Sequence, residues 1–130
     1  MLVRAFAWSG MKADAARLLP VVEDIAASGV VLLYDGTLVR LPCGVAAACA
    51  GHWERAEAHY AAALEQAEGM SHQAACAETR FWWAAMLRDR ARAGDEDRAR
   101  VLMTHAANEL ERLEMPLYAC RAREWLSRPC

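Results

Sequence analysis

The sequence predicts an all-α fold of six or seven antiparallel helices. Three observations support this class. Much of the hydrophobic fraction of 56% is alanine, which favours helices and lets them pack closely. Glycine and proline are sparse, with seven and four copies, and they separate stretches whose apolar residues recur at helical spacing. The one β-branched stretch has no second strand to pair with, so no sheet is expected.

The helices are expected, in order, over residues 2–9, 12–27, 38–50, 53–68, 71–92, a segment that begins at Asp95, and 116–127. Pro20 lies inside the second of them and predicts a kink, because proline cannot donate a helical hydrogen bond. Residues 28–37 break the helical pattern and are expected to form a loop. Ser71 and Asp95 are residue types that favour N-cap positions. Pro116 suits the first turn of the last helix.

A spacing pattern recurs along the chain. It consists of a glycine, an alanine five residues later, a large apolar residue four beyond that, and a smaller apolar residue three further on. The three copies are Gly10, Ala15, Leu19, Val22; Gly51, Ala56, Tyr60, Ala63; and Gly94, Ala99, Met103, Ala106. A period of roughly forty residues is typical of stacked helical repeats.

Pairing of helices explains this pattern. The glycine makes the tight turn between the two helices of a unit, the alanine lets their backbones approach, and the large residue fills the groove between them. Each unit keeps one open apolar face, which a stacked neighbour covers. We therefore expect one domain over residues 1–130, an α-α superhelix with units near 1–27, 38–68 and 71–113 and a partial unit over 116–127.

The second copy of the pattern resembles the tetratricopeptide repeat, so the superhelix is expected to be a fragment of such a solenoid. The residues that match the family's positions are Gly51, Trp53, Ala56, Tyr60 and Ala63 in one unit, Gly44 before them, and Trp83 and Met86 in the next unit. Two positions depart from the family. Leu87 stands where a small glycine is expected, and Arg40 where a tryptophan is expected.

The long units are more specifically similar to the helical C-terminal region of large bacterial regulators. Those proteins join a signalling ATPase domain to an adenylate cyclase domain or to a LuxR-type DNA-binding domain. The segments that carry the similarity are CGVAAACAGHWERAEAHYAAALEQAEGM, AETRFWWAAMLRDRARAGDEDRARVLM and LEMPLYACRAR, within roughly residues 10–126. No phosphate-binding loop, cyclase motif or helix-turn-helix accompanies them. The resemblance implies a non-catalytic segment in signalling or transcription regulation.

Composition narrows the expected partners and location. The formal net charge of −2 provides no basic field for nucleic acid or an anionic membrane, so neither is an expected partner. No apolar stretch approaches the roughly 20 residues of a membrane span. The five cysteines are an odd number without a CxxC pair, and the N-terminus lacks the pattern of a signal peptide. We therefore expect reduced thiols and a cytoplasmic location.

The groups that could carry chemistry do not assemble into a recognisable site. Two His/Cys pairs at helical spacing, Cys49 with His52 and His72 with Cys76, each supply two ligands, whereas a structural zinc site needs four. No metal or other cofactor is therefore expected. The glutamates of residues 53–68 lie on the outer face of that helix, where carboxylates are poor acid–base catalysts, so we expect no enzyme. The alternating charges of residues 88–100 predict a solvated turn with local ion pairs.

The function expected is protein or peptide binding on the concave face of the superhelix. The residues predicted to form this face are Leu38, Leu41, Val45, Phe81, Ala84 and Arg88. The alternative is a small-molecule-sensing domain with a pocket between helices, lined by Tyr60, Arg80, Trp82 and Trp83. At the C-terminal end, Leu117, Tyr118 and Trp125 are expected to leave apolar area uncovered, which predicts self-association or cover by the rest of a longer protein.

Overall fold

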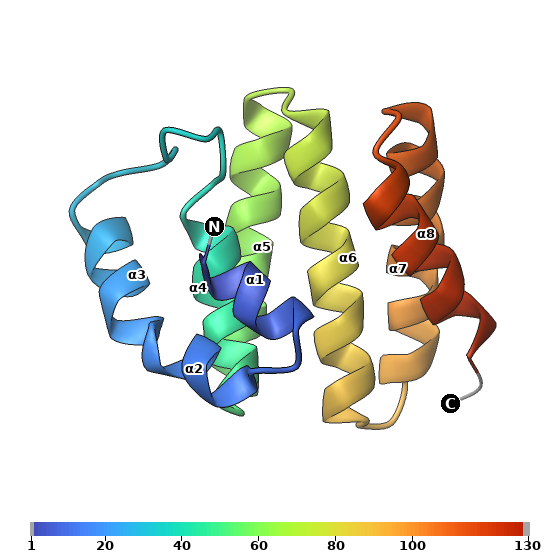
Figure 1. Cartoon of the computed structure of the whole chain (residues 1–130), viewed down its shortest axis with the longest axis horizontal. Helices are drawn as coiled ribbons and strands as arrows, with labels where there is room; N and C mark the ends of the chain where they lie inside the picture. Colours follow the sequence, from blue (N-terminus) through green and yellow to red (C-terminus); the bar gives the residue numbers. More distant parts are fainter. Residues whose placement is uncertain (1, 129–130) are drawn as a thin grey trace. The chain divides into compact units, whose positions relative to one another are not determined.

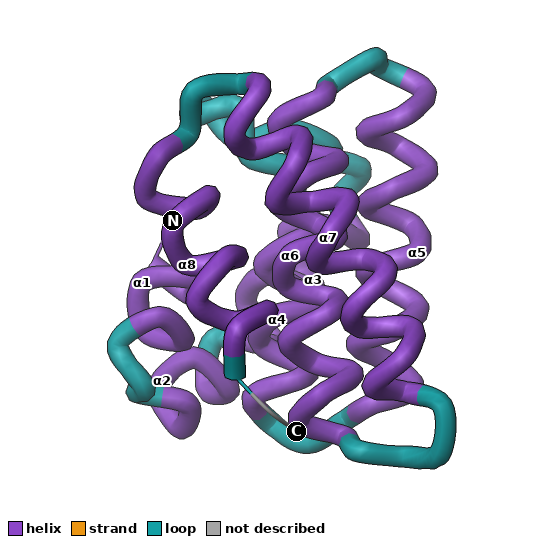
Figure 2. Tube along the Cα trace, turned by 90° about the vertical axis from the view of Figure 1, so that its right-hand side faces the viewer, coloured by secondary structure: helices purple, strands orange, loops and turns teal. Residues whose placement is uncertain are grey.

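The chain is all-α, as predicted, in a computed structural model that describes residues 2–128 (Figures 1 and 2). The helices of the described residues are α1 (Leu2–Trp8), α2 (Lys12–Arg17), α3 (Leu19–Ala27), α4 (Arg40–Cys49), α5 (Trp53–Gly69), α6 (Gln73–Arg90), α7 (Asp95–Arg112) and α8 (Pro116–Ser127). The fold divides into two compact units, one up to Glu65 and one from Gln66 onward. The expectation of one domain over residues 1–130 stays a prediction. Each unit is described by itself below.

The prediction of six or seven helices is corrected to eight within residues 2–128, because one expected helix is two. The segment 12–27 breaks at Leu18, which is the C-cap of α2 and the N-cap of α3. Pro20 explains the break, since its ring would clash with the carbonyl of Ala16 in a continuous helix. In the first turn of a new helix the missing N–H costs nothing.

Two predicted caps are also corrected. Ser71 lies in the left-handed region with φ of 53°, and the N-cap of α6 is His72, whose Nδ1 accepts a hydrogen bond from the Ala75 amide at 3.3 Å. The N-cap of α7 is Gly94, and Asp95 is the first helical residue. Ser71 and Asp95 are residue types that often begin helices. The backbone conformation nevertheless places the N-cap one residue after Ser71 and one residue before Asp95.

The recurring sequence pattern corresponds to a recurring turn. Gly10, Gly51 and Gly94 each end a turn between two helices with φ of 78°, 78° and 82°, a conformation that glycine adopts without steric cost. The alanines of the pattern, Ala15, Ala56 and Ala99, are 0% exposed, and the apolar positions that follow them are all buried. The spacing in the sequence therefore identifies positions that the fold buries.

Helix α4 is the centre of the N-terminal unit (Figure 1). Every residue from Leu41 to Ala47 is buried, and α4 packs against α1, α2 and α3. On α5 the ring of Tyr60, 1% exposed, packs directly on Gly44. A Cβ atom at Gly44 would lie 2.7 Å from the Tyr60 Cε1 atom, so only glycine fits this contact.

The segment between α3 and α4 forms a loop, as predicted, with a short hairpin-like turn in it (Figure 1). Leu32 and Leu38 face each other across an isolated antiparallel bridge. The amide of Leu33 donates to the Thr37 carbonyl at 2.8 Å, and the amide of Val39 donates to the Val31 carbonyl at 2.9 Å. Arg4 of α1 donates to the Thr37 hydroxyl at 2.9 Å, which ties the returning arm to the helices.

In the C-terminal unit, α7 packs against both α6 and α8. The face of α7 that meets them carries Ala99, Met103, Ala106 and Leu110, all 0% exposed. Helix α8 begins with Pro116, as expected, and buries Ala119 and Ala122. Small side chains thus set the spacing in this unit as they do around α4.

The contact between Gly44 and Tyr60 generates a stability prediction. Gly44→Ala should lower the free energy of unfolding by roughly 1–3 kcal/mol, because the added methyl overpacks a buried ring. Gly69→Ala is the matched control, since a Cβ atom there meets nothing within 4 Å. Urea unfolding followed by circular dichroism measures both. Equal stability of the parent and Gly44→Ala would contradict the packing described here.

Candidate functional site

The residues predicted to form the concave binding face are mostly buried. Leu38, Leu41 and Val45 of the N-terminal unit are at most 2% exposed. Phe81 and Ala84 of the C-terminal unit are 7% and 0% exposed. These side chains therefore expose little surface that a partner could contact. Binding of a partner through them stays a prediction.

Arg88, the charged member of that set, is occupied within its own unit. Its Nε and Nη2 donate to both carboxylate oxygens of Glu96, at 3.0 and 2.6 Å, and its Nη1 donates to the Trp125 carbonyl at 2.9 Å. The guanidinium carbon also lies 3.3 Å from the centroid of the Trp125 ring. Arg88 therefore joins α6, α7 and α8, because a planar guanidinium can stack and make several directed bonds at once.

The four residues of the alternative pocket belong to different environments. Tyr60 lies in the N-terminal unit against Gly44. In the C-terminal unit, Arg80 pairs with Glu68 at 3.3 Å, while Trp83 is partly buried. Trp82 donates from its indole nitrogen to the Tyr118 hydroxyl at 3.2 Å. A ligand pocket lined by these residues stays a prediction.

Phe81, Trp82 and Tyr118 form an aromatic cluster on α6 and α8. The Phe81 ring meets the Trp82 and Tyr118 rings edge to face, with centroids 5.4 and 5.2 Å apart. Of the three residues expected to leave apolar area uncovered, Tyr118 and Trp125 are partly buried by such contacts, and Leu117 is 66% exposed. Self-association through this end stays a prediction.

The charged segment 88–100 forms local ion pairs, as predicted, but one of them is not solvated. Arg90 donates two hydrogen bonds of 2.7 Å to Asp95, and the two side chains are only 6% and 4% exposed. The Arg92 amide also donates to Asp95 at 3.0 Å. The hydrogen bonds from Arg90, which outweigh the effect of burial, hold the pKa of Asp95 at about 2.

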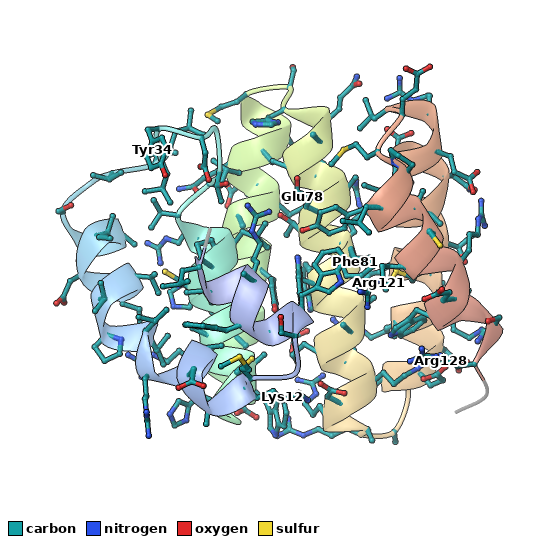
Figure 3. The ribbon with its side chains drawn as sticks, in the orientation of Figure 1. Lys12, Tyr34, Glu78, Phe81, Arg121 and Arg128 are labelled. Atoms are coloured by element: carbon teal, nitrogen blue, oxygen red, sulfur yellow. The ribbon has the colours of Figure 1, made fainter. Side chains whose placement is uncertain are left out.

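An apolar surface is exposed in the loop between α3 and α4. Val30, Val31 and Leu32 are 41%, 39% and 44% exposed, and the Tyr34 side chain is fully exposed (Figure 3). We call residues 30–34 the loop segment. Isolated exposed apolar residues are common on proteins, but four in one short segment mark a candidate contact surface.

A polar hollow lies in the same unit, between α3, the start of α4, and α5. Its volume is about 400 Å³. The residues that line it are Glu23, Ala26 and Ala27 of α3, Arg40 of α4, and Arg55, Ala58 and His59 of α5. Four of the lining side chains can carry charge and the other three are alanines, so the lining combines polar groups with apolar ones.

Hydrogen bonds connect the polar groups of the hollow. His59 Nε2 lies 2.9 Å from Glu23 Oε1, and Arg55 Nη2 donates to Glu23 Oε2. Arg40 Nη1 lies 3.2 Å from His59 Nδ1. Burial alone would raise the pKa of Glu23, but the bonds from His59 and Arg55 outweigh it, so this pKa lies below its ordinary value.

Cys43, one turn after Arg40 in α4, is fully buried. Burial, reinforced by the nearby charge of Glu23, raises the pKa of its thiol to about 11. Within residues 2–128, no group of three or more histidine, cysteine or acidic side chains lies close enough together to hold a metal ion. Among the same residues, no helix is both long enough and apolar enough to cross a bilayer.

Sequence reasoning did not find the hollow. In the sequence, Arg40 stands out only as a departure from the tetratricopeptide pattern. Arg55 and His59 are four residues apart, which places them on one face of α5, and that spacing is the signal that could have suggested a site. Glu23 lies in another helix across a loop, so its arrival beside them depends on the tertiary fold.

Comparison of the chain with protein-family models, curated proteins and solved structures finds no match.

The contacts of Arg88 predict a structural role. Arg88→Lys should destabilise the protein by roughly 1–3 kcal/mol, because lysine cannot keep the two bonds to Glu96 and the stacking on Trp125 together. Amide hydrogen exchange should accelerate in α8. Arg98→Lys is the control, since the Arg98 side chain is 51% exposed. Unchanged exchange in α8 would show that Arg88 does not hold it.

The Arg90–Asp95 pair predicts a pH dependence. The folded-state pKa of Asp95, about 2, lies below its ordinary value of 3.8, so the pair stabilises the fold above about pH 4 and loses this effect as pH falls towards 2. Asp95→Asn should cost on the order of 2 kcal/mol at about pH 6, and its difference from the parent should shrink between about pH 4 and 2. Thermal unfolding across this range measures it, with exposed Asp97→Asn as control. A difference independent of pH would contradict the assignment.

Proposed function

We propose that this chain is a non-catalytic module that binds another protein, and that the loop segment, residues 30–34, is its contact surface. The observation that carries the proposal is the full exposure of Tyr34 beside three partly exposed aliphatic residues. Tyrosine buries a large area at a small entropic cost, which is why it dominates many binding surfaces.

The partner we expect offers an extended, apolar segment. Residues 30–34 carry no charge. Val31 and Leu33 use their backbone groups towards Val39 and Thr37, so the backbone groups of Leu32 point to the outer edge. An extended segment of the partner can pair at that edge and cover the neighbouring side chains, which is a common mode of peptide recognition.

The setting we propose is the one that the resemblance implies, a tetratricopeptide-like helical segment of a bacterial signalling or transcriptional regulator, acting in the cytoplasm. The glycine turns and the fully buried alanines of the repeated pattern support a scaffold of this kind. In such a setting the module would carry a signal by binding, and the chemistry would belong to another domain or chain.

The proposal is tested by placing a photo-cross-linking amino acid at position 34. In extract of the source cells it should give a discrete cross-linked protein, which the same label at exposed Arg17 should not give. The captured protein is then purified and its Kd for the unlabelled chain measured. Tyr34→Ser should weaken binding by roughly ten-fold or more, the effect of removing a central contact residue.

Arg17→Ser is the matched control and should bind like the parent, because Arg17 is exposed on α2, outside the loop segment. Equal cross-linking at both positions, or an unchanged Kd for Tyr34→Ser, would contradict the proposed contact surface.

A further inference from the structure

The hollow between α3, α4 and α5 contains an arginine whose charge is not matched. Within the described residues, Arg40 makes one hydrogen bond, to His59, and no ion pair. It is partly buried, so water does not fully solvate it. A guanidinium that gives one of its five N–H donors to an uncharged ring retains capacity to bind an anion.

The geometry indicates that His59 is uncharged in this arrangement. Arginine can only donate, so the contact between Arg40 Nη1 and His59 Nδ1 requires Nδ1 to accept. The ring proton is then on Nε2, where it donates to Glu23 at 2.9 Å. The hydrogen-bond network thus assigns one tautomer, because protonating Nδ1 would set a donor against a donor.

The charges of the hollow then sum to one positive charge. Arg40 and Arg55 are cations, Glu23 is an anion held by Arg55 and His59, and His59 is neutral. Helix α4 begins at Arg40, and the N-terminal end of a helix carries the positive end of the helix dipole. No acidic residue in the first turn of α4 offsets this positive charge. A ligand with one negative charge completes this balance, whereas a dianion would also face the carboxylate of Glu23.

We propose that this hollow binds a short-chain carboxylate, with the carboxylate on Arg40 and the apolar part of the ligand against the lining alanines. A volume of about 400 Å³ suits a small molecule. Ala26, Ala27 and Ala58 supply apolar contact without filling the space. The carboxylate could belong to a free acid or to an acidic side chain, and the experiment distinguishes these sources. This inference does not rest on the proposed protein-binding function.

The test is titration of the ¹⁵N-labelled full chain with sodium butyrate at constant ionic strength, followed by NMR. The amide signals of Ala27, Arg40 and His59 should shift and saturate with a Kd of roughly millimolar order, as expected for so small a ligand. Butyramide, which has the same shape without the charge, should give no saturable shift. Arg40→Gln should weaken butyrate binding by roughly ten-fold or more.

Three further variants keep the test decisive. Ala58→Leu changes no charge and lies at an exposed position, so it should fold and should block binding by filling the hollow. Arg17→Gln removes an exposed arginine elsewhere in the same unit and should leave the Kd unchanged. Tyr34→Ser should also leave it unchanged, which separates this site from the loop segment.

A second titration uses a blocked Ala-Ala-Glu-Ala-Ala peptide and its glutamine counterpart. Tighter binding of butyrate identifies a free acid as the ligand, and tighter binding of the glutamate peptide identifies an acidic side chain. Either result supports a carboxylate site. Shifts that do not saturate with any carboxylate, equal binding by Arg40→Gln, or tighter binding of inorganic phosphate than of butyrate would overturn the proposal.

Discussion

The close packing of α4 is the constraint on which the N-terminal unit depends. Neighbours can approach an α-helix closely where its side chains are small, and Gly44, Ala46 and Ala47 are small and buried. Tyr60 then fixes α5 against α4 at Gly44. Because α4 and α5 are held in this way, Arg40 and His59 are brought within hydrogen-bond distance, and the loop between α3 and α4 is anchored at its second end.

In the C-terminal unit, charged side chains at the end of α6 fix the positions of the neighbouring helices. Arg88 and Arg90 lie on its last turn, yet they act on different neighbours. Arg88 holds Glu96 and Trp125, while Arg90 holds Asp95 at the start of α7. Removing one partner of such a pair leaves an uncompensated charge, so both arginines favour the one arrangement in which their partners are within reach.

The features predictable from the sequence were those set by local spacing. The helix class, the order of the helices and the glycine turns follow from residues a few positions apart, and the buried alanines follow from the repeated pattern. The division at Leu18 was missed because a proline inside a helical pattern can bend a helix or end it. Ser71 and Asp95 were assigned as caps by residue type, whereas the backbone conformation of the turn decides the cap. The hollow was missed because Glu23 and His59 meet only through the packing of α3 and α5.

The burial of Cys43 in α4 has a consequence for solution chemistry. A thiol reacts with alkylating reagents as the thiolate, and burial both shields this sulfur and keeps it protonated. Alkylation of Cys43 therefore requires α4 to separate from its neighbours, whereas Cys120 is exposed and reacts without any opening. The ratio of the two alkylation rates measures how often the N-terminal unit opens, so the chain carries a natural probe of its own local unfolding.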